Sequence, residues 1–195
     1  MMQYQLLEQK SLYSGFFKLQ NYRLKHQLFQ GGWSQEFTRE ILQRGNAAGV
    51  LLFDPKTDQL VLIEQFRPGA IESDYPWIME VVAGMIESDE TPKQVVQREA
   101  IEESGVQIKG LKLIHHYYSS PGGSDEQIWL FIGQINIDQI AEYAGLENEN
   151  EDIKVHRLAA TEVFDWLKKG KINNAMTIIA LQWLQLQPER NLIFD

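Results

Sequence analysis

Three glutamates, Glu99, Glu102 and Glu103, stand at positions i, i+3 and i+4 of a segment with a helical pattern. A helix places all three carboxylates on one face, where like charges cost roughly 0.2–0.5 kcal/mol per pair. Such a face is often only a solvated surface, but a bound cation would remove the repulsion. Mg²⁺ prefers oxygen ligands and usually shares a few carboxylates with substrate phosphates and water. The spacing therefore predicts a site for Mg²⁺ and a diphosphate.

The helix that would carry these carboxylates has clear start and stop signals. Thr91 is a good N-cap, Pro92 suits the first helical position, and Gln94 completes a capping box with Thr91. Gly105 can adopt the left-handed conformation that ends helices. We therefore predict a helix of about thirteen residues. Its narrow apolar stripe consists of Val95, Val96 and Ala100.

The whole segment 84–106 (GMIESDETPKQVVQREAIEESGV) resembles the Nudix box. Every defining position is filled, namely Gly84, Glu90, Arg98, Glu99, Ala100, Glu102, Glu103, Gly105 and Val106. The resemblance agrees with Glu99 and Glu103 as ligands of Mg²⁺, or of Mn²⁺ as a substitute ion. Glu102, beside them, can bind another ion or organise the water shell. It also implies a metal contact from the backbone carbonyl of Ala83, which precedes the turn at Gly84.

Three further residues could support this site. Arg98 could be an ordinary surface residue, but its planar guanidinium suits a two-point contact that orients Glu90 or a metal ligand. The Nudix resemblance implies this orienting role for Arg98. Glu90 would then help to fix the orientation of the metal ligands without touching the metal. Glu80 interrupts the apolar run IMEVVAG. It lies either on a solvated face or close to the metal, and we favour the second position.

Composition narrows the class of protein. The 195 residues, 44% of them hydrophobic, suit one well-packed domain with a small appended subdomain. A net charge of −9, from 18 Lys+Arg against 27 Asp+Glu, argues against nucleic-acid or anionic-membrane partners. Without cysteine, the chain has no disulfide or thiolate chemistry. No secretory leader or long apolar run is visible, so a cytoplasmic location is expected.

The elements around the predicted helix indicate an α/β fold. Residues 1–46 are predicted to form a small antiparallel β-subdomain that dimerises, with strands at 13–19, 22–28 and 36–43. Residues 47–195 are predicted to be the catalytic domain, with a helix capped by Thr161 and a last helix from about Asn174. Its strands are predicted at 50–53, 60–66, 77–82, 111–118, 127–135 and 153–158. A mixed sheet between helices follows, which matches the α/β/α sandwich implied by the Nudix resemblance.

Beyond the box, most of the chain is similar to the bacterial ADP-ribose pyrophosphatase family. The similar segments are GNAA at 45–48, LIEQFR at 62–67, EVVAGMIE at 80–87, SPGG at 120–123 and IALQWLQL at 179–186. This resemblance implies Mg²⁺-dependent hydrolysis of ADP-ribose to AMP and ribose 5-phosphate. The alternatives are a hydrolase of another nucleotide sugar, such as GDP-mannose, and a sensor that binds ADP-ribose without cleaving it.

The same resemblance suggests substrate contacts outside the box. Phe16 would stack on adenine, although Phe16-Phe17 could equally belong to a core. Arg39 and Glu40 would contact the nucleotide side, and Arg67 would pair with diphosphate oxygens. Either arginine could instead be a surface charge. Glu126, after the turn at 121–123, would reach the terminal ribose or its metal.

An acidic loop, residues 146–152 (LENENED), could supply the general base. Taken alone the loop would be a solvated surface, but a carboxylate on a mobile loop can accept the proton of an attacking water. We favour Glu149, with Glu151 next. The resemblance also implies a homodimer with shared active sites, in which N-terminal strands complete the partner's nucleotide pocket and Phe16 serves the other subunit.

Overall fold

The computed structural model describes residues 1–194, which divide into two compact units. One unit consists of residues 1–46 together with residues 117–127, and the other of residues 47–116 and 128–194. The division expected from sequence lay at residue 46 alone. Residues 117–127, which contain the SPGG turn, therefore group with the N-terminal strands as well.

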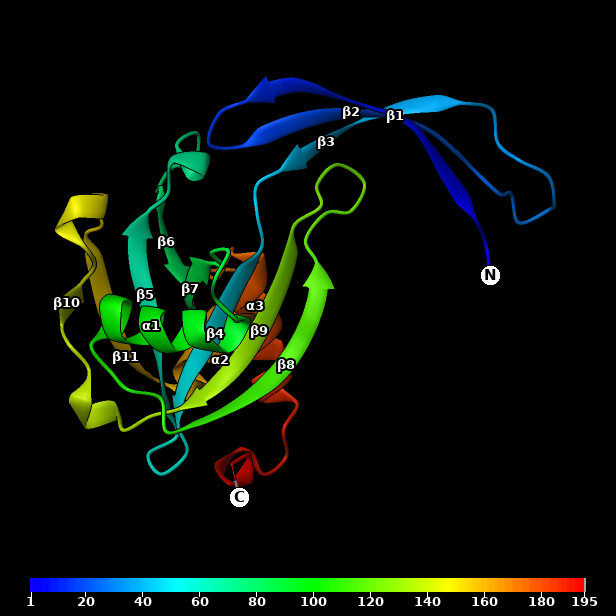
Figure 1. Ribbon diagram of the computed structural model, residues 1–195. Coiled ribbons are helices and arrows are strands. Elements are labelled where there is room, and N and C mark those ends of the chain that lie inside the picture. Colours follow the sequence, from blue (N-terminus) through cyan, green and yellow to red (C-terminus); the bar gives the residue numbers. More distant parts are fainter. Residues whose placement is uncertain (195) are drawn as a thin grey trace. The chain divides into compact units, whose positions relative to one another are not determined.

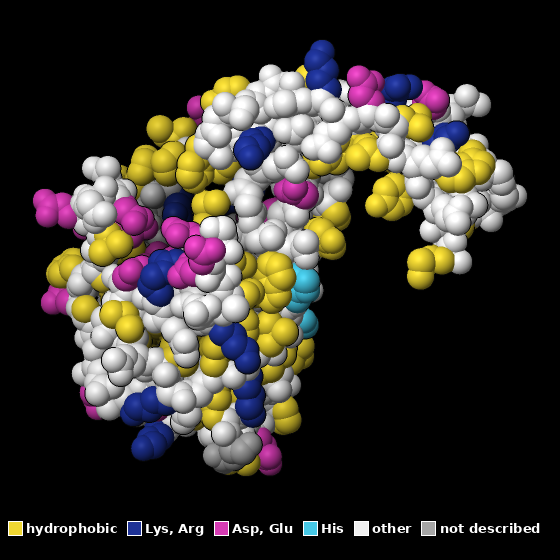
Figure 2. All heavy atoms as spheres, in the orientation of Figure 1, with side chains coloured by type: hydrophobic (Ala, Val, Ile, Leu, Met, Phe, Trp, Pro, Cys, Tyr) yellow, Lys and Arg dark blue, Asp and Glu magenta, His cyan; other side chains and the backbone are white. Residues whose placement is uncertain are grey.

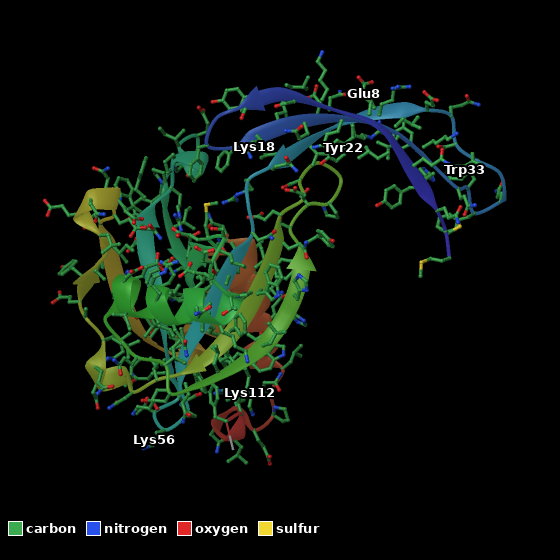
Figure 3. The ribbon with its side chains drawn as sticks, in the orientation of Figure 1. Glu8, Lys18, Tyr22, Trp33, Lys56 and Lys112 are labelled. Atoms are coloured by element: carbon green, nitrogen blue, oxygen red, sulfur yellow. The ribbon has the colours of Figure 1, made fainter. Side chains whose placement is uncertain are left out.

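The first unit is built on a three-stranded antiparallel sheet in the order β1-β2-β3. The strands are β1 (Tyr4–Ser14), β2 (Lys18–His26) and β3 (Phe37–Gln43). All eleven residues of β1 are exposed. Figure 3 labels Glu8 on β1, Tyr22 on β2 and Trp33 in the connection between β2 and β3. The sheet buries little apolar surface within its own unit.

In the described part of the chain, the second unit contains a mixed sheet with the order β10-β11-β5-β4-β9-β8. Strand β4 pairs in parallel with β9 and antiparallel with β5, while β6 pairs with β5 and β7 with β4. The strands are β4 (Ala47–Asp54), β5 (Gln59–Phe66), β6 (Trp77–Glu80), β7 (Val82–Met85), β8 (Gly110–Tyr118), β9 (Gln127–Gln134), β10 (Tyr143–Ala144) and β11 (Ile153–Ala159).

Helices cover both faces of this sheet (Figure 1). Helix α1 (Pro92–Ser104) contacts β4 and β7, and its buried Val95, Val96 and Ala100 join the main core cluster. Helices α2 (Ala160–Lys168) and α3 (Ala175–Gln185) contact each other, β11, β4 and β6. Because side chains alternate along a strand, Val50 and Leu52 face α1 while Leu51 and Phe53 lie on the other face. The predicted layer arrangement is confirmed.

Helix α1 begins and ends where its sequence predicts. The Thr91 side chain accepts a hydrogen bond from the Gln94 N–H, the Gln94 side chain bonds back to Thr91, and Pro92 occupies the first turn. Gly105 ends the helix with φ 71°. The thirteen residues between these caps are helical, so local signals alone set the length of the helix that carries the carboxylates.

Several local predictions are wrong. Residues 77–82 do not form one strand, because β6 ends at Glu80 and pairs with β5, whereas β7 begins at Val82 and pairs with β4. Strand β1 begins at Tyr4, before the first predicted strand. Residues 13–19 do not form one strand, because β1 ends at Ser14 and Gly15 turns the chain, with its N–H bonded to the Phe17 carbonyl. The N-cap of α2 is Ala159 and not Thr161, because β11 runs directly into the helix and the Ala160 N–H donates to the Asp58 carbonyl. A backbone partner from the β4–β5 turn takes the place of a capping side chain.

Three short 3₁₀ turns occupy longer connections: η1 (Pro68–Ala70), η2 (Ile137–Gln139) and η3 (Glu147–Glu149), with a fourth, η4 (Arg190–Leu192), near the C-terminus. Within residues 1–194, no helix is both long and apolar enough to span a membrane.

Candidate active site

Arg98 is the centre of the carboxylate cluster on α1. Its Nε and Nη2 donate to the two oxygens of Glu90 at 2.9 and 3.0 Å, which is the two-point contact that the sequence predicts. Its Nη1 donates to Glu99 at 2.7 Å and to Glu102 at 2.9 Å. Glu90 in turn has its pKa lowered by Arg98. One guanidinium therefore orients three carboxylates (Figure 2 shows acidic side chains gathered around basic ones beside α1).

Glu103 lies deeper than its neighbours, with 2% of its surface exposed. Its Oε2 accepts a hydrogen bond from the Ala83 N–H at 3.0 Å, which ties α1 to β7. Gly84, the next residue of β7, lies against the Glu99 carboxylate, and a Cβ there would overlap it. The glycine of the box is thus required by a close approach of strand and side chain, because its φ is not in the left-handed region.

The electrostatics of these two glutamates are unusual. Burial, with help from Glu102 and Glu151 and against the attraction of Arg98, raises the pKa of Glu99 to about 7. Burial, Glu99 and Glu151 together raise the pKa of Glu103 to about 8, against the Ala83 N–H and the charge of Arg67. Negative charge is thus costly here unless a cation is added.

The residues present fit a hard divalent cation. The side-chain atoms of Glu99, Glu102 and Glu103 that could ligate a metal are all carboxylate oxygens. One oxygen of each residue accepts the hydrogen bonds described above. Within residues 1–194, the second oxygen of each has no hydrogen-bond partner in the structure. The three are not already drawn together as a metal cluster in this part of the chain. Arg98 donates to Glu99 and Glu102, and Ala83 donates to Glu103, so a bound cation would share these carboxylates with the N–H donors.

Arg67 and Glu80 meet beside this cluster. The Nε of Arg67 donates to Glu80 Oε2 at 2.6 Å, and Glu80 is 8% exposed. The other oxygen of Glu80 accepts from Asn174 Nδ2 at 2.7 Å. Since the Arg67 charge acts on Glu103, the arginine lies within electrostatic reach of the carboxylates. Glu80 is therefore not on a solvated face, and its side chain is hydrogen-bonded to Arg67 and Asn174.

The two candidate bases differ in position. Glu149 is exposed at the end of η3, which Asn150 closes with φ 56°. Glu151 is half-buried, lies near the Leu146 N–H at 3.4 Å, and its charge acts on both Glu99 and Glu103. In this conformation Glu151 is the loop carboxylate with an electrostatic link to the cluster.

The remaining expected contacts belong to the first unit. Phe16 is 80% exposed and Phe17 is 38% exposed, so the core alternative for this pair does not hold in the chain by itself. The two rings meet edge to face at 5.0 Å. Arg39 and Glu40 are exposed on β3, where the Arg39 guanidinium lies 4.8 Å from the Phe37 ring.

Glu126 is buried within the same unit and pairs with Arg44 Nη1 at 3.2 Å. Arg44 also lies over the Phe17 ring at 5.8 Å. Sequence reasoning missed both Arg44 and Asn174. Arg44 directly precedes the GNAA segment, a signal that was present but not used, whereas Asn174 is recognisable only through its contact with Glu80, 94 residues away.

Comparison with known proteins places the chain in a family. Residues 43–177 match the NUDIX domain, so the chain belongs to the Nudix family, as its 84–106 segment indicates. The crystal structure of an ADP compounds hydrolase superposes with a TM-score of 0.71 at 19% identity, covering 95% of this chain and 96% of that one. The expected Nudix α/β/α fold is confirmed.

Curated relatives divide into two groups. The ADP-ribose pyrophosphatase of Escherichia coli strain K12 is 45% identical over 183 residues, which is 93% of this chain and 88% of that protein. The ADP-ribose pyrophosphatase of Haemophilus influenzae is 45% identical over 186 residues, covering 93% and 86%. The GDP-mannose pyrophosphatase of Cronobacter sakazakii is 34% identical over 187 residues, covering 94% and 95%.

Proposed function

We propose that this protein hydrolyses the diphosphate of ADP-ribose, yielding AMP and ribose 5-phosphate, with Mg²⁺ as cofactor and Mn²⁺ as a substitute ion. The observation that carries the proposal is the carboxylate cluster on α1 beside Arg67, with Glu103 buried and Glu99 and Glu102 partly buried, in a chain 45% identical to ADP-ribose pyrophosphatases. The higher identity to these relatives than to GDP-mannose pyrophosphatases, at 34%, favours ADP-ribose over the alternative nucleotide sugar.

Glu99, Glu102 and Glu103 would hold the ion, with the backbone carbonyl of Ala83. When bound there, Mg²⁺ supplies charge neutralisation for the diphosphate and favours ionisation of the attacking water. Arg98 keeps Glu99 and Glu102 oriented, and Glu90 fixes Arg98 from the other side. The chain thus holds the carboxylate oxygens in a fixed arrangement for the ion. Without the ion, their negative charge would repel the diphosphate.

Arg67 would bind the diphosphate oxygens. The Arg67 Nε–H already donates to Glu80. Within residues 1–194, Nη1 and Nη2 of Arg67 have no hydrogen-bond partner in the structure, so both remain for a two-point contact with phosphate oxygens. In the reaction, the oxygen of a water attacks the adenosyl phosphorus, and the bond from that phosphorus to the bridging oxygen breaks. The bridging oxygen leaves with ribose 5-phosphate. A loop carboxylate accepts the water proton, for which we propose Glu149 first and Glu151 second.

Substrate selection would come from the first unit. Phe16 stacks on adenine, Arg39 and Glu40 contact the nucleotide side, and Glu126 contacts the terminal ribose or its metal. We also propose that residues 1–46 form a dimerising subdomain of a homodimer with shared sites, next to a catalytic domain of residues 47–195, and that the enzyme acts in the cytoplasm. The wholly exposed strand β1 supports a sheet that pairs with a second copy.

The test is hydrolysis of ADP-ribose with Mg²⁺ in ¹⁸O-labelled water, followed by mass spectrometry beside Glu99→Gln. Label in AMP, lost in the variant, is the expected result. Label in ribose 5-phosphate would keep the reaction but move the attack to the other phosphorus. Faster turnover of GDP-mannose would reassign the substrate. Binding of ADP-ribose without turnover would favour the alternative of a sensor. The four glutamates of the box argue against that outcome, because a protein that only binds ADP-ribose does not need them.

Glu149→Gln and Glu151→Gln separate the two candidate bases. Loss of kcat with unchanged affinity for the Mg²⁺–substrate complex identifies the base. The residue that instead supports the ion would show weakened Mg²⁺ dependence. Because Glu151 acts on Glu99 and Glu103 in the structure, its variant also shows whether that link matters for the metal.

A further inference from the structure

We propose that Asn174 is a positioning residue for catalysis, which holds Glu80 and through it the diphosphate-binding Arg67. This inference rests on the proposed function of Arg67. Three hydrogen-bonding groups form a chain from the start of α3 to the guanidinium: Asn174 Nδ2 donates to Glu80 Oε1 at 2.7 Å, and Glu80 Oε2 accepts from Arg67 Nε at 2.6 Å. Each oxygen of Glu80 is thus used by a different partner.

Asn174 is itself held rigidly. It is the N-cap of α3, and its Oδ1 accepts from the Thr177 N–H at 3.0 Å and from the Thr177 hydroxyl at 3.1 Å. Thr177 is fully buried, and its hydroxyl oxygen accepts from the Val81 N–H at 3.0 Å. Val81 directly follows Glu80, so the cap anchors the strand that carries Glu80 as well as the Glu80 side chain.

The arrangement answers a problem of electrostatics and rotamer freedom. A carboxylate that is 8% exposed needs hydrogen-bond donors, and Arg67 alone satisfies only one of its oxygens. With Asn174 on the other oxygen, Glu80 has one orientation, and its Oε2 is directed at Arg67 Nε. Arg67 has 41% of its side chain exposed and would lose side-chain entropy on binding phosphate. Orientation before substrate arrives lowers that cost.

Two variants separate this role from helix capping. Asn174→Ser keeps a side-chain oxygen suited to an N-cap but cannot reach Glu80 with an amide donor, whereas Asn174→Ala loses both functions. We expect kcat/KM for ADP-ribose to fall on the order of tenfold in both, chiefly through a higher KM, because a misplaced Arg67 weakens substrate binding. Only Asn174→Ala should lower the melting temperature clearly.

Arg190→Met is the matched stability control. Arg190 forms two hydrogen bonds to Asp58 at 2.5 and 2.6 Å. Within residues 1–194 neither residue is hydrogen-bonded to Asn174, Glu80 or Arg67, so the substitution destabilises the same unit and leaves the hydrogen bonds of Glu80 in place. We expect a lowered melting temperature at unchanged KM. The proposal would be overturned if kcat/KM of the Asn174 variants fell only in proportion to their lower melting temperature while KM stayed unchanged. That result would mean a merely structural role.

A double-mutant cycle tests the route of action. In an Arg67→Ala background, Asn174→Ser should have no further effect on kcat/KM, because the group it positions is absent. A full additional tenfold loss in that background would overturn the inference. If Arg67→Ala alone leaves kcat/KM unchanged, the assigned role of Arg67 fails and the inference fails with it. If wild-type protein does not hydrolyse ADP-ribose, the proposed function fails. The kcat/KM values of the double-mutant cycle are then measured with the nucleotide sugar that the protein does hydrolyse.

Discussion

The cluster on α1 and the sheet β1–β3 differ in how their functional side chains are held. Around Arg98, the structure supplies a hydrogen-bond partner for Glu90, Glu99 and Glu102 within one unit. On β1, all eleven residues are exposed, and Phe16 after it is 80% exposed. The first region is organised by contacts inside the chain. The second presents aromatic and charged groups that its own unit leaves uncovered.

This difference suggests a division of labour. Reaction chemistry requires ligands and charges at fixed positions, which buried and hydrogen-bonded glutamates provide. Recognition of a base requires an accessible aromatic face, which an exposed phenylalanine provides. If the comparison is right, substitutions on α1 should abolish turnover, while substitutions on the N-terminal sheet should change substrate affinity and assembly.

The largest effect is expected for Glu103→Gln. The amide keeps the shape of the side chain but loses the charge of a buried carboxylate proposed as a metal ligand. We expect kcat to fall on the order of 10³-fold, as loss of several kcal/mol of electrostatic stabilisation implies. Steady-state kinetics over a Mg²⁺ titration measures the loss. Activity within threefold of wild type would remove Glu103 from the site.

Arg98→Lys should have the next largest effect. Lysine keeps the positive charge but cannot make the fork that contacts three glutamates at once, so the carboxylates lose their common orientation. We expect a loss of roughly 10- to 100-fold in kcat/KM, typical of groups that orient metal ligands. Unchanged kinetics together with an unchanged Mg²⁺ dependence would show that charge alone is sufficient at this position.

Phe16→Ala should affect affinity but not stability. An exposed ring contributes little to folding, so the melting temperature should stay near that of wild type. Stacking on a base is worth about 1–3 kcal/mol, so KM for ADP-ribose should rise roughly tenfold or more. Tyr4→Ala is a control, since Tyr4 is also an exposed aromatic of this unit but has no proposed contact with the base.

Mixing Phe16→Ala with Glu103→Gln protein tests whether sites are shared. If Phe16 serves the other subunit, exchange of subunits creates one site with both wild-type residues, and activity should exceed the sum of the separate variants. Complete absence of recovery after verified exchange would place Phe16 and Glu103 in the same subunit's site. Absence of any exchange, with a monomer by size-exclusion chromatography, would contradict the dimer.

The smallest effect is a dependence of stability on pH in metal-free protein. In the folded state the pKa of Glu99 is raised to about 7 and that of Glu103 to about 8, from the ordinary glutamate value of 4.5. At pH values between the unfolded and the folded pKa, the folded chain binds more protons than the unfolded chain. The free energy of unfolding should therefore decrease as pH rises from about 5 to 8. Thermal melts in a chelator should show this decrease.

Added Mg²⁺ should oppose that loss, because a ligand that binds only the folded state stabilises it and favours ionised carboxylates. Glu103→Gln removes one of the two groups and should flatten the pH profile in the chelator. A wild-type profile that rises over the same range would contradict the assignment of these two glutamates as the dominant titrating groups.

The sequence was informative where the determinants of structure are close together along the chain. The capping box at Thr91 and Gln94 and the stop at Gly105 predicted helix α1 with its bounds, and the i, i+3, i+4 spacing predicted one carboxylate face. No sequence signal predicts strand β1 over residues 4–12, because all its side chains are exposed and no buried face imposes an alternating pattern. Thr161 has a side chain suited to an N-cap, but α2 begins one residue earlier, where the Ala160 N–H donates to the Asp58 carbonyl.

By itself, then, the sequence determined the box helix, its glutamates, and the family to which the chain belongs, because helix caps and one-turn spacings act over a few residues. Only the tertiary structure decided that Gly84 lies against Glu99, that Glu103 accepts from Ala83, and that Asn174 holds Glu80. These contacts join residues 15, 20 and 94 positions apart. Their formation depends on strands and helices packing together, and no local pattern in the chain specifies that packing.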